Sequence, residues 1–437
     1  MNAPRTRPAG HVNARWFTLF TVAWLMVWTV QLTPLQLLLP LQLDTQDTEA
    51  GWIAGVISSG LVLGVGGLAG VIAGPLAGAL SDRSSASRPR RRPWALAGVW
   101  VTALCLLLTG MAEGPFAIGA AWVGVSIGIA MTSAAFTAMI ADQLPFEQRG
   151  AAASAASSSQ AIGIVVGVGT VVLLGLGIFH GYLVLAIAMA VVGTAVALLL
   201  PDPPLGTGRA LPTREPGEKR FAFLHDRDFT WMLVGRLIVN IGNALITALF
   251  LFFLLYGLGQ PMGEAEDNLL LLIVIYTVFV VAASVITGNI SDRIGKRRVL
   301  TIASALVQAL SGVLLAISPT FEMTMVGAAL MGVGYGGYMT VGLAFATDLL
   351  PSERDHARDL GVVNVTAAFG QLLGPVIGAG LVALVGGFWL LLVMAAVLSL
   401  LGAGVTALAR EGGSRRESSG LSPRRSQDRG HHSTTAP

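Results

Sequence analysis

Long stretches without charged side chains dominate this chain and predict membrane-spanning helices. No acidic or basic residue occurs between Arg15 and Asp44, or between Glu49 and Asp82. Each stretch exceeds the roughly 20 residues that a helix needs to cross a bilayer. Pro75 falls inside the second stretch, and membrane helices tolerate proline when neighbouring groups satisfy the freed backbone. We therefore expect the first two spans here.

The same pattern continues along the chain and predicts an all-α integral membrane protein, with twelve transmembrane helices in two pseudo-symmetric six-helix halves. The later spans are expected at 94–112, 116–141, 151–176, 182–200, 229–258, 269–288, 299–317, 323–346, 361–385 and 388–409. A charged, proline-bearing segment between the two groups is typical of a linker. The last residues are rich in Ser, Arg and Pro, which indicates disorder. The predicted parts are the amino-terminal arm 1–15, the half 16–200, the linker 201–228, the half 229–409 and the tail 410–437.

Composition supports a membrane protein and disfavours other classes. Hydrophobic residues make up 54% of the 437 positions and charged residues 12%, against about 25% charged in soluble domains. No nucleotide-binding Gly-x-x-x-x-Gly-Lys-Ser/Thr loop occurs, which disfavours an ATP-driven pump. The single cysteine, Cys105, lies inside an expected span and offers neither a disulfide nor a metal site. We expect no enzymatic activity and no cofactor.

A short polar motif occurs twice and indicates a duplicated half. Ser-Asp-Arg stands at 81–83 and again at 291–293, and each copy precedes a basic run. The two motif aspartates are 210 residues apart, whereas Asp142 and Asp348, in Asp-x-x-Pro segments, are 206 apart. A four-residue length difference inside the first copy accounts for the change. One hydrophobic half followed by its copy is typical of secondary transporters.

The distribution of charge predicts the orientation. Cytoplasmic loops are enriched in Lys and Arg, and an amino terminus in the cytoplasm places the basic residues on that side, with Arg236 as the exception. The other loops carry acids, among them Asp44, Glu113, Glu264 and Glu322. We expect a monomeric, multi-pass plasma-membrane protein with both termini in the cytoplasm. Its basic charge then reflects topology and does not indicate nucleic-acid binding.

The duplicated loops resemble a known signature. Gly78-x-x-x-Asp82-Arg83 and Gly288-x-x-x-Asp292-Arg293-x-Gly295-Lys296-Arg297 are similar to the loop motif of the major facilitator superfamily of secondary transporters. The second copy matches in full, and the first has Pro89 where a glycine would precede the basic run. The resemblance covers the whole twelve-helix chain and implies transport by alternating access. The expected gate residues are Gly78, Asp82, Arg83, Gly288, Asp292, Arg293, Lys296 and Arg297.

The two gate aspartates need partners. Asp82 and Asp292 stand at helix carboxyl ends, where the macrodipole disfavours an acid. By pseudo-symmetry, we expect each to meet the amino terminus of a helix in the opposite half, near Gly361 for Asp82 and near Ala151 for Asp292. Such contacts would hold the cytoplasmic ends together in the outward-open state. The alternative is that these charges fix the topology and solvate a turn.

A narrower resemblance concerns the cargo. The spacing from Ser81-Asp82-Arg83 to the Arg-Arg-Arg-Pro-Trp run at 90–94 is similar to that of glycoside-cation and sucrose-type symporters. It implies a sugar or glycoside moved with a proton or sodium ion. A cation-coupled carrier usually needs a titratable carboxylate inside the membrane, and none lies near the centre of an expected span. The alternatives are coupling through Asp142 or Asp348 at the inner mouth of the cavity, or uniport.

Polar residues inside the spans predict a cargo cavity between the halves. Arg236, Asn240, Asn243 and Thr247 follow three- and four-residue spacing, so they share one face of the seventh helix. Arg236 has three open interpretations: contact with a carboxylate or phosphate of the cargo, a structural strut, or snorkelling to the inner surface. The other expected cargo contacts are Trp28, Gln31 and Gln36 on the first helix, Gln160 on the fifth, Tyr335 and Tyr338 on the tenth, and Asn364 and Gln371 on the eleventh.

Three functions remain open at this point. The first is secondary transport of a small organic solute, sugar-like and cation-coupled if the narrower resemblance holds. The second is proton-coupled efflux of drug-like or secondary-metabolite compounds. Gly370-x-x-x-Gly374-Pro375-x-x-Gly378 resembles the glycine-proline motif of drug-proton antiporters, although it stands on the eleventh helix and not the fifth. The third is a non-transporting sensor on a carrier fold, which would need a signalling domain that the linker and tail are too short to hold.

Overall fold

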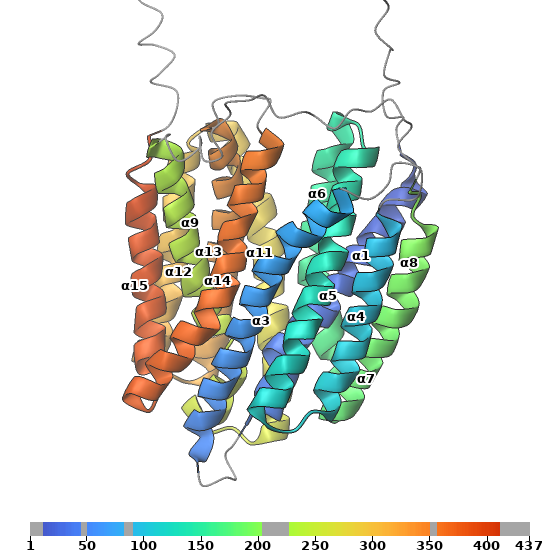
Figure 1. Ribbon diagram of the computed structural model, residues 1–437. Helices are drawn as coiled ribbons and strands as arrows, with labels where there is room; N and C mark the ends of the chain where they lie inside the picture. The colour runs from blue at the N-terminus through green and yellow to red at the C-terminus, as the bar shows by residue number, and fades with distance from the viewer. Residues whose placement is uncertain (1–11, 45–49, 83–90, 203–226, 350–355, 411–437) are drawn as a thin grey trace, which may run out of the picture.

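Helices make up all the regular structure in the part of the chain that the computed structural model describes, residues 12–44, 50–82, 91–202, 227–349 and 356–410 (Figure 1). Twelve spans are long and apolar enough to cross a membrane, which confirms the predicted fold class. The first six are built by α1 (Ala14–Thr33), η1 (Pro34–Leu38), α2 (Leu39–Gln42), α3 (Gly51–Asp82), α4 (Arg92–Met111), α5 (Gly114–Gln143), α6 (Phe146–Leu173), α7 (Ile178–Ala188), η2 (Met189–Gly193) and α8 (Thr194–Leu199). The other six are built by α9 (Arg227–Thr247), α10 (Phe250–Phe252), η4 (Phe253–Gly257), α11 (Met262–Ile294), α12 (Arg297–Ile317), α13 (Phe321–Asp348), α14 (His356–Val385) and α15 (Trp389–Thr406).

Several helices differ from the expected bounds. α6 and α14 begin at Phe146 and His356, one turn or more before the positions expected from the apolar pattern. α11 extends past the expected 269–288 at both ends, because its helix begins after Pro261 and ends at Gly295, whose φ of 71° stops the helix. The first, sixth and seventh spans are not continuous α-helices, since each contains a π-helical segment. The expected linker lies mostly outside the described residues.

The helices form two groups that lie side by side, α1 to α8 on the right of Figure 1 and α9 to α15 on the left. We call these groups the first and second halves. Across the boundary, α3 packs against α14 and α6 packs against α11. α1 begins and α15 ends at the same end of the bundle (Figure 1). Arginines at the starts of several helices lie there, and we call it the basic end. The opposite end carries Asp44, Glu113 and Glu264, and we call it the acidic end.

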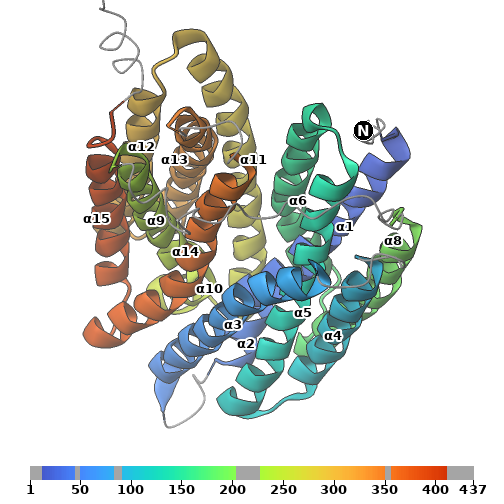
Figure 2. The ribbon, with the colours of Figure 1, turned by 45° about the horizontal axis from the view of Figure 1, so that its top comes forward.

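Glycines on α3 show where the halves touch. A Cβ added at Gly60 would lie 2.8 Å from the carbonyl oxygen of Pro375, and one at Gly67 would lie 3.2 Å from the Cα of Leu372. Farther toward the basic end, a Cβ at Gly74 or Gly78 would meet nothing within 4 Å. The halves are therefore in close contact toward the acidic end and spread apart toward the basic end (Figure 2).

We expect Gly60→Leu to lower the thermal unfolding midpoint of the purified protein. Overpacking a close helix contact costs about 1–3 kcal/mol, because the α14 backbone has no room to yield. Gly78→Leu is the matched control, since it makes the same change on the same helix in open space, away from Pro75, and gains the same helix propensity. Equal midpoints for the two variants would show that α3 and α14 do not pack as described.

Candidate functional site

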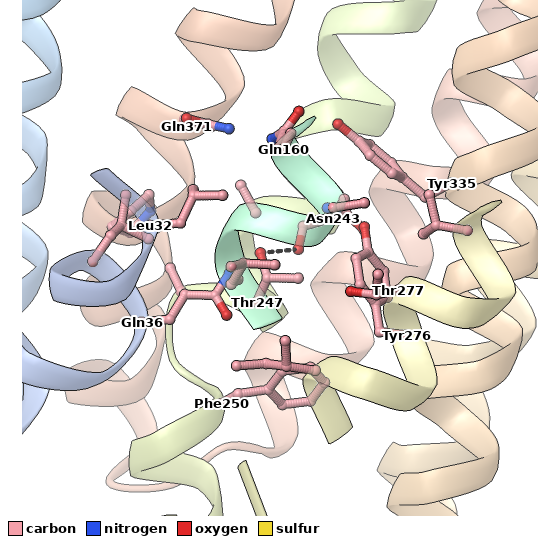
Figure 3. Close-up of a pocket in the computed structure, with 18 of the residues that line it drawn as sticks. Leu32, Gln36, Gln160, Asn243, Thr247, Phe250, Tyr276, Thr277, Tyr335 and Gln371 are labelled. Atoms are coloured by element: carbon pink, nitrogen blue, oxygen red, sulfur yellow. Dashed lines mark hydrogen bonds between the residues drawn. The ribbon is translucent and has the colours of Figure 1, made fainter. Parts of the chain in front are cut away.

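A cavity of about 150 Å³ lies between the two halves (Figure 3). Its walls come from α1, η1 and α6 of the first half and from α9, α10, α11, α13 and α14 of the second. Its polar lining consists of Gln36, Ser157, Gln160, Asn243, Thr247, Tyr276, Thr277, Tyr335 and Gln371. No charged side chain belongs to the described lining. The described lining is therefore polar and uncharged.

Three glutamines supply unpaired amide groups. Gln36 comes from η1, Gln160 from α6 and Gln371 from α14. Within the described structure, none of these amides has a hydrogen bond to a protein group, and Gln160 and Gln371 direct their amides into the same space (Figure 3). Each amide offers two donor hydrogens and an acceptor oxygen. Both halves therefore present free hydrogen-bonding groups to whatever enters.

Two tyrosines and one asparagine form the opposite wall, and a second asparagine outside the lining is bonded to one of the tyrosines. The Tyr335 hydroxyl donates to Oδ1 of Asn240 at 3.1 Å, and the Tyr276 hydroxyl donates to Oδ1 of Asn243 at 3.3 Å. Nδ2 of Asn240 donates to the carbonyl oxygen of Arg236 at 2.8 Å, which determines which way that amide faces. The ring centroids of the tyrosines lie 6.4 Å apart. Because both phenol hydrogens are used, the phenol oxygens retain lone pairs that accept hydrogen bonds.

Arg236 lies behind this wall and not in the cavity lining. Its side chain is 3% exposed, and its Nη1 donates to the carbonyl oxygen of Met339 at 3.4 Å. A Cβ added at Gly342 would lie 3.4 Å from the same nitrogen, so that glycine leaves room for the guanidinium. The guanidinium thus has one backbone partner on α13, whereas its Nε has no hydrogen-bond partner within the described structure, and the role of Arg236 stays a prediction.

Five of the eleven expected cargo contacts line the cavity: Gln36, Gln160, Asn243, Tyr335 and Gln371. Trp28 instead donates from Nε1 to the carbonyl oxygen of Ala156 at 3.0 Å, and the Tyr338 hydroxyl pairs with that of Thr406 at 3.0 Å. Gln31 is half-buried outside the lining, and the side chain of Asn364 lies outside the description. The cargo role of the residues outside the lining stays a prediction.

Sequence reasoning missed Tyr276 and Thr277 on α11. They form a polar pair inside the otherwise apolar run 269–283, and that contrast was a usable signal. Ser157 was also missed, because it stands in a run of small residues on α6 that gives no sign of which one faces a cavity. Thr247 continues the stripe of Arg236, Asn240 and Asn243, and its hydroxyl donates to the carbonyl oxygen of Asn243 at 3.1 Å.

Two ion pairs at the basic end occupy equivalent positions in the two halves. Nε of Arg91 lies 2.8 Å from Oδ2 of Asp142 in the first half. Nη1 of Arg297 lies 2.7 Å from Oδ1 of Asp348 in the second half. Both partners are displaced by the same 206 residues between the copies. The expected coupling carboxylates thus pair within their own halves, outside the cavity lining, and their coupling role stays a prediction.

The expected gate residues are only partly described. Asp292 is exposed and its carboxylate lies 3.8 Å from Nη2 of Arg297 in its own half. Lys296 precedes α12, and a Cβ at Gly288 would lie 3.4 Å from Thr340, also within the second half. The side chain of Asp82 and all of Arg83 lie outside the described residues. The helix starts expected as partners lie at Phe146 and His356 and not near Ala151 and Gly361, so the proposed dipole contacts would have to form there.

Comparisons with known proteins agree with this fold. A 124-residue stretch is 32% identical to myo-inositol transporter 3C of Cryptococcus neoformans, covering 28% of this chain and 21% of that protein. A 194-residue stretch is 25% identical to the multidrug transporter mfsC of Aspergillus fumigatus, covering 44% of this chain and 36% of that protein. The matched stretches thus span well under half the length of either relative.

A solved structure and a family model extend the likeness to nearly the whole chain. The crystal structure of a mutant of the nucleoside transporter NupG superposes with a TM-score of 0.70 at 15% identity, covering 90% of this chain and 99% of that one. The likeness to sucrose-type symporters stays a prediction. The Major Facilitator Superfamily model matches residues 19–271 and 237–434. This multi-pass membrane protein therefore belongs to the Major Facilitator Superfamily of transporters.

Proposed function

We propose that the protein is a secondary transporter of an uncharged, hydroxyl-bearing organic solute of the sugar or polyol type. The observation that carries this proposal is the cavity between the halves, where three unpaired glutamine amides face a tyrosine and asparagine wall without a charged side chain in the described lining. Such a site binds by hydrogen bonds and offers no counter-charge to an ionic cargo.

The lining matches a ring that carries several hydroxyl groups. A glutamine amide can donate to one hydroxyl and accept from its neighbour. The phenol oxygens of Tyr276 and Tyr335 can accept from further hydroxyls. Phe250 and Pro375 add apolar surface, against which the C–H face of such a ring packs. A few placed polar groups among apolar ones are typical of small-molecule sites.

We propose further that the basic end faces the cytoplasm, following the enrichment of Lys and Arg in cytoplasmic loops. The spread of the halves at the basic end then corresponds to a state open to the cytoplasm. Closure of that end would bring Asp82 and Asp292 toward the opposite half, as the gate hypothesis requires. Coupling to a proton or sodium ion, with Asp142 and Asp348 as the candidate carboxylates, and uniport remain the two alternatives.

The efflux alternative loses one of its supports. The glycines that resemble the antiporter motif pack α14 against α9, since an added Cβ would lie 2.6 Å from the Cβ of Asn240 at Gly370 and 2.9 Å from the carbonyl carbon of Ala244 at Gly374. Close helix contact explains these glycines without a role in antiport. What still favours efflux is the names of several relatives, among them a multidrug transporter and an exporter.

Binding and transport by the purified protein test the proposal. We expect neutral cyclic polyols and monosaccharides to raise the thermal unfolding midpoint, since ligands that bind the folded state stabilise it. The stabilising compound should also exchange across the membrane of proteoliposomes in counterflow, with and without a pH gradient to reveal coupling. Stabilisation by hydrophobic cations or organic anions alone would contradict a neutral cargo and favour efflux.

A further inference from the structure

An aspartate and a tyrosine outside the expected gate join the two halves at the acidic end. The Tyr256 hydroxyl donates to the Asp44 carboxylate and lies 2.6 Å from each of its oxygens. Asp44 follows α2 in the first half, and Tyr256 belongs to η4 in the second. Hydrogen bonds to an ionised acceptor are about twice as strong as neutral ones. This contact therefore ties one half to the other directly.

Aromatic rings surround the same contact and also cross between the halves. Trp52, near the start of α3, stacks on Tyr256 with centroids 4.8 Å apart and planes 16° apart. It also stacks on Phe388 of the second half, at 5.7 Å and 15°. Phe253 meets the edge of Phe388 at 5.6 Å. A ring of the first half is thus held between two rings of the second, in geometries that aromatic pairs favour.

We propose that Asp44, Tyr256, Trp52 and Phe388 form an outer latch, which keeps the acidic end closed while the halves are spread at the basic end. Alternating access requires that the contacts at one end break as those at the other form. The contacts described between the halves lie toward the acidic end, so the latch stands where they must break before cargo can reach the cavity from that side. Asp44 and Tyr256 hold the two halves together at the acidic end until this opening occurs.

The latch is joined to the cavity through the backbone of the first and seventh spans. Gln36 lines the cavity from η1, and the same span then continues through α2 to Asp44. Phe250 lines the cavity from α10, directly before η4 and Tyr256. π-helical turns occur frequently at functional sites and change helix register locally. Cargo that contacts Gln36 and Phe250 can therefore shift the equilibrium between the closed and the open outer latch. This step rests on the proposed function, whereas the latch itself does not.

Distance measurements between spin labels test the latch without any cargo. With Cys105 replaced by Ala, we would place labels at Phe116 and Leu384, which are 90% and 76% exposed near the acidic end of different halves. A second pair at Gly150 and Ile294 would report on the basic end. We expect Asp44→Asn and Tyr256→Phe each to raise the ratio of long to short distances at the acidic end by about tenfold. Asp44→Asn replaces the charge-assisted hydrogen bond with a weaker neutral one, and Tyr256→Phe removes the hydrogen bond.

Two matched controls remove similar groups that do not join the halves. Glu113→Gln removes a charge from an exposed residue at the same end, and Tyr182→Phe removes a buried hydroxyl that has no hydrogen-bond partner in the described structure. Both should leave the distances unchanged. Distances in Asp44→Asn and Tyr256→Phe that match the parent protein would overturn the latch, as would equal shifts in the controls.

A crosslink provides a second variant that strengthens the contact instead of weakening it. With Cys105 replaced by Ala and no spin labels, cysteines at 44 and 256 would be bridged by a short, reducible bifunctional thiol reagent, which spans the gap that the tyrosine ring leaves. The bridge should stop counterflow and reduction should restore it, and counterflow that continues in the bridged protein would contradict the latch. A latch that responds as expected in a protein that moves no polyol would contradict the proposed cargo alone.

Discussion

Replacing Asp142 with Asn should lower the free energy of unfolding by about 2 kcal/mol, because it weakens the charge-assisted hydrogen bond that the largely buried Arg91 guanidinium donates to this carboxylate. The Arg91 side chain is 6% exposed and that of Asp142 is 28% exposed. Nη1 of Arg91 also donates to the Ser81 hydroxyl at 2.5 Å. The guanidinium thus joins the ends of α3 and α5 at the start of α4.

The duplicated half supplies the matched control for this prediction. Asp348→Asn makes the same change in the equivalent ion pair, where the side chains of Arg297 and Asp348 are 24% and 51% exposed. Exposed pairs contribute about 1 kcal/mol or less, so the control should lower the thermal unfolding midpoint much less. Equal losses for the two variants would show that burial does not separate the two ion pairs and that the prediction is wrong.

The architecture was predictable because it depends on features that are local or periodic in sequence. Uncharged runs identify spans through the cost of placing charge in lipid, and a constant offset identifies the duplication. The offset of 206 residues that relates Asp142 to Asp348 also relates Arg91 to Arg297. The ion pairs themselves could not be predicted, since each joins helices whose relative rotation depends on packing along their whole length.

The cavity was harder to predict than the spans. A polar residue inside a span faces either the cavity or a neighbouring helix, and the sequence pattern is the same in both cases. Gln160 and Gln371 face the cavity, whereas Trp28 and Tyr338 form hydrogen bonds on adjacent helices. Arg236 illustrates the same limit, because its place behind the wall depends on a carbonyl of α13 that is distant in sequence.

The outer latch depends on contacts that sequence patterns do not reveal. Asp44 and Tyr256 are separated by 212 positions, and the apolar pattern marks both only as residues at span ends. The π-helical segments at 34–38 and 253–257 also lacked a sequence signal, apart from Pro34. Such segments depend on how neighbouring helices satisfy the displaced backbone groups, which is a property of the folded bundle.

Replacing Gln160 or Gln371 with Leu should weaken cargo binding by about ten- to a hundredfold. Leucine has a similar size, so the cavity keeps its shape, but the hydroxyls that the amide served enter without partners. Leaving such groups unpaired costs about 1–3 kcal/mol, and each 1.4 kcal/mol corresponds to about tenfold in affinity. The stabilising polyol's dissociation constant, measured by calorimetry, and the KM of counterflow should rise together.

Gln31→Leu is the matched comparison, since Gln31 lies on α1 outside the cavity lining, and the same measurement tests the cargo contact expected for Gln31 itself. It removes an amide of the same size from the first half, so the affinity should stay within about twofold of the parent protein. The double variant of Gln160 and Gln371 should lose more than either single variant, because the two amides reach the cavity from opposite halves and a polyol bridging them contacts both. If the single variants bind as tightly as the Gln31→Leu control, these amides do not contact the cargo, and the neutral hydrogen-bonding site must be sought on the wall formed by Tyr276 and Tyr335.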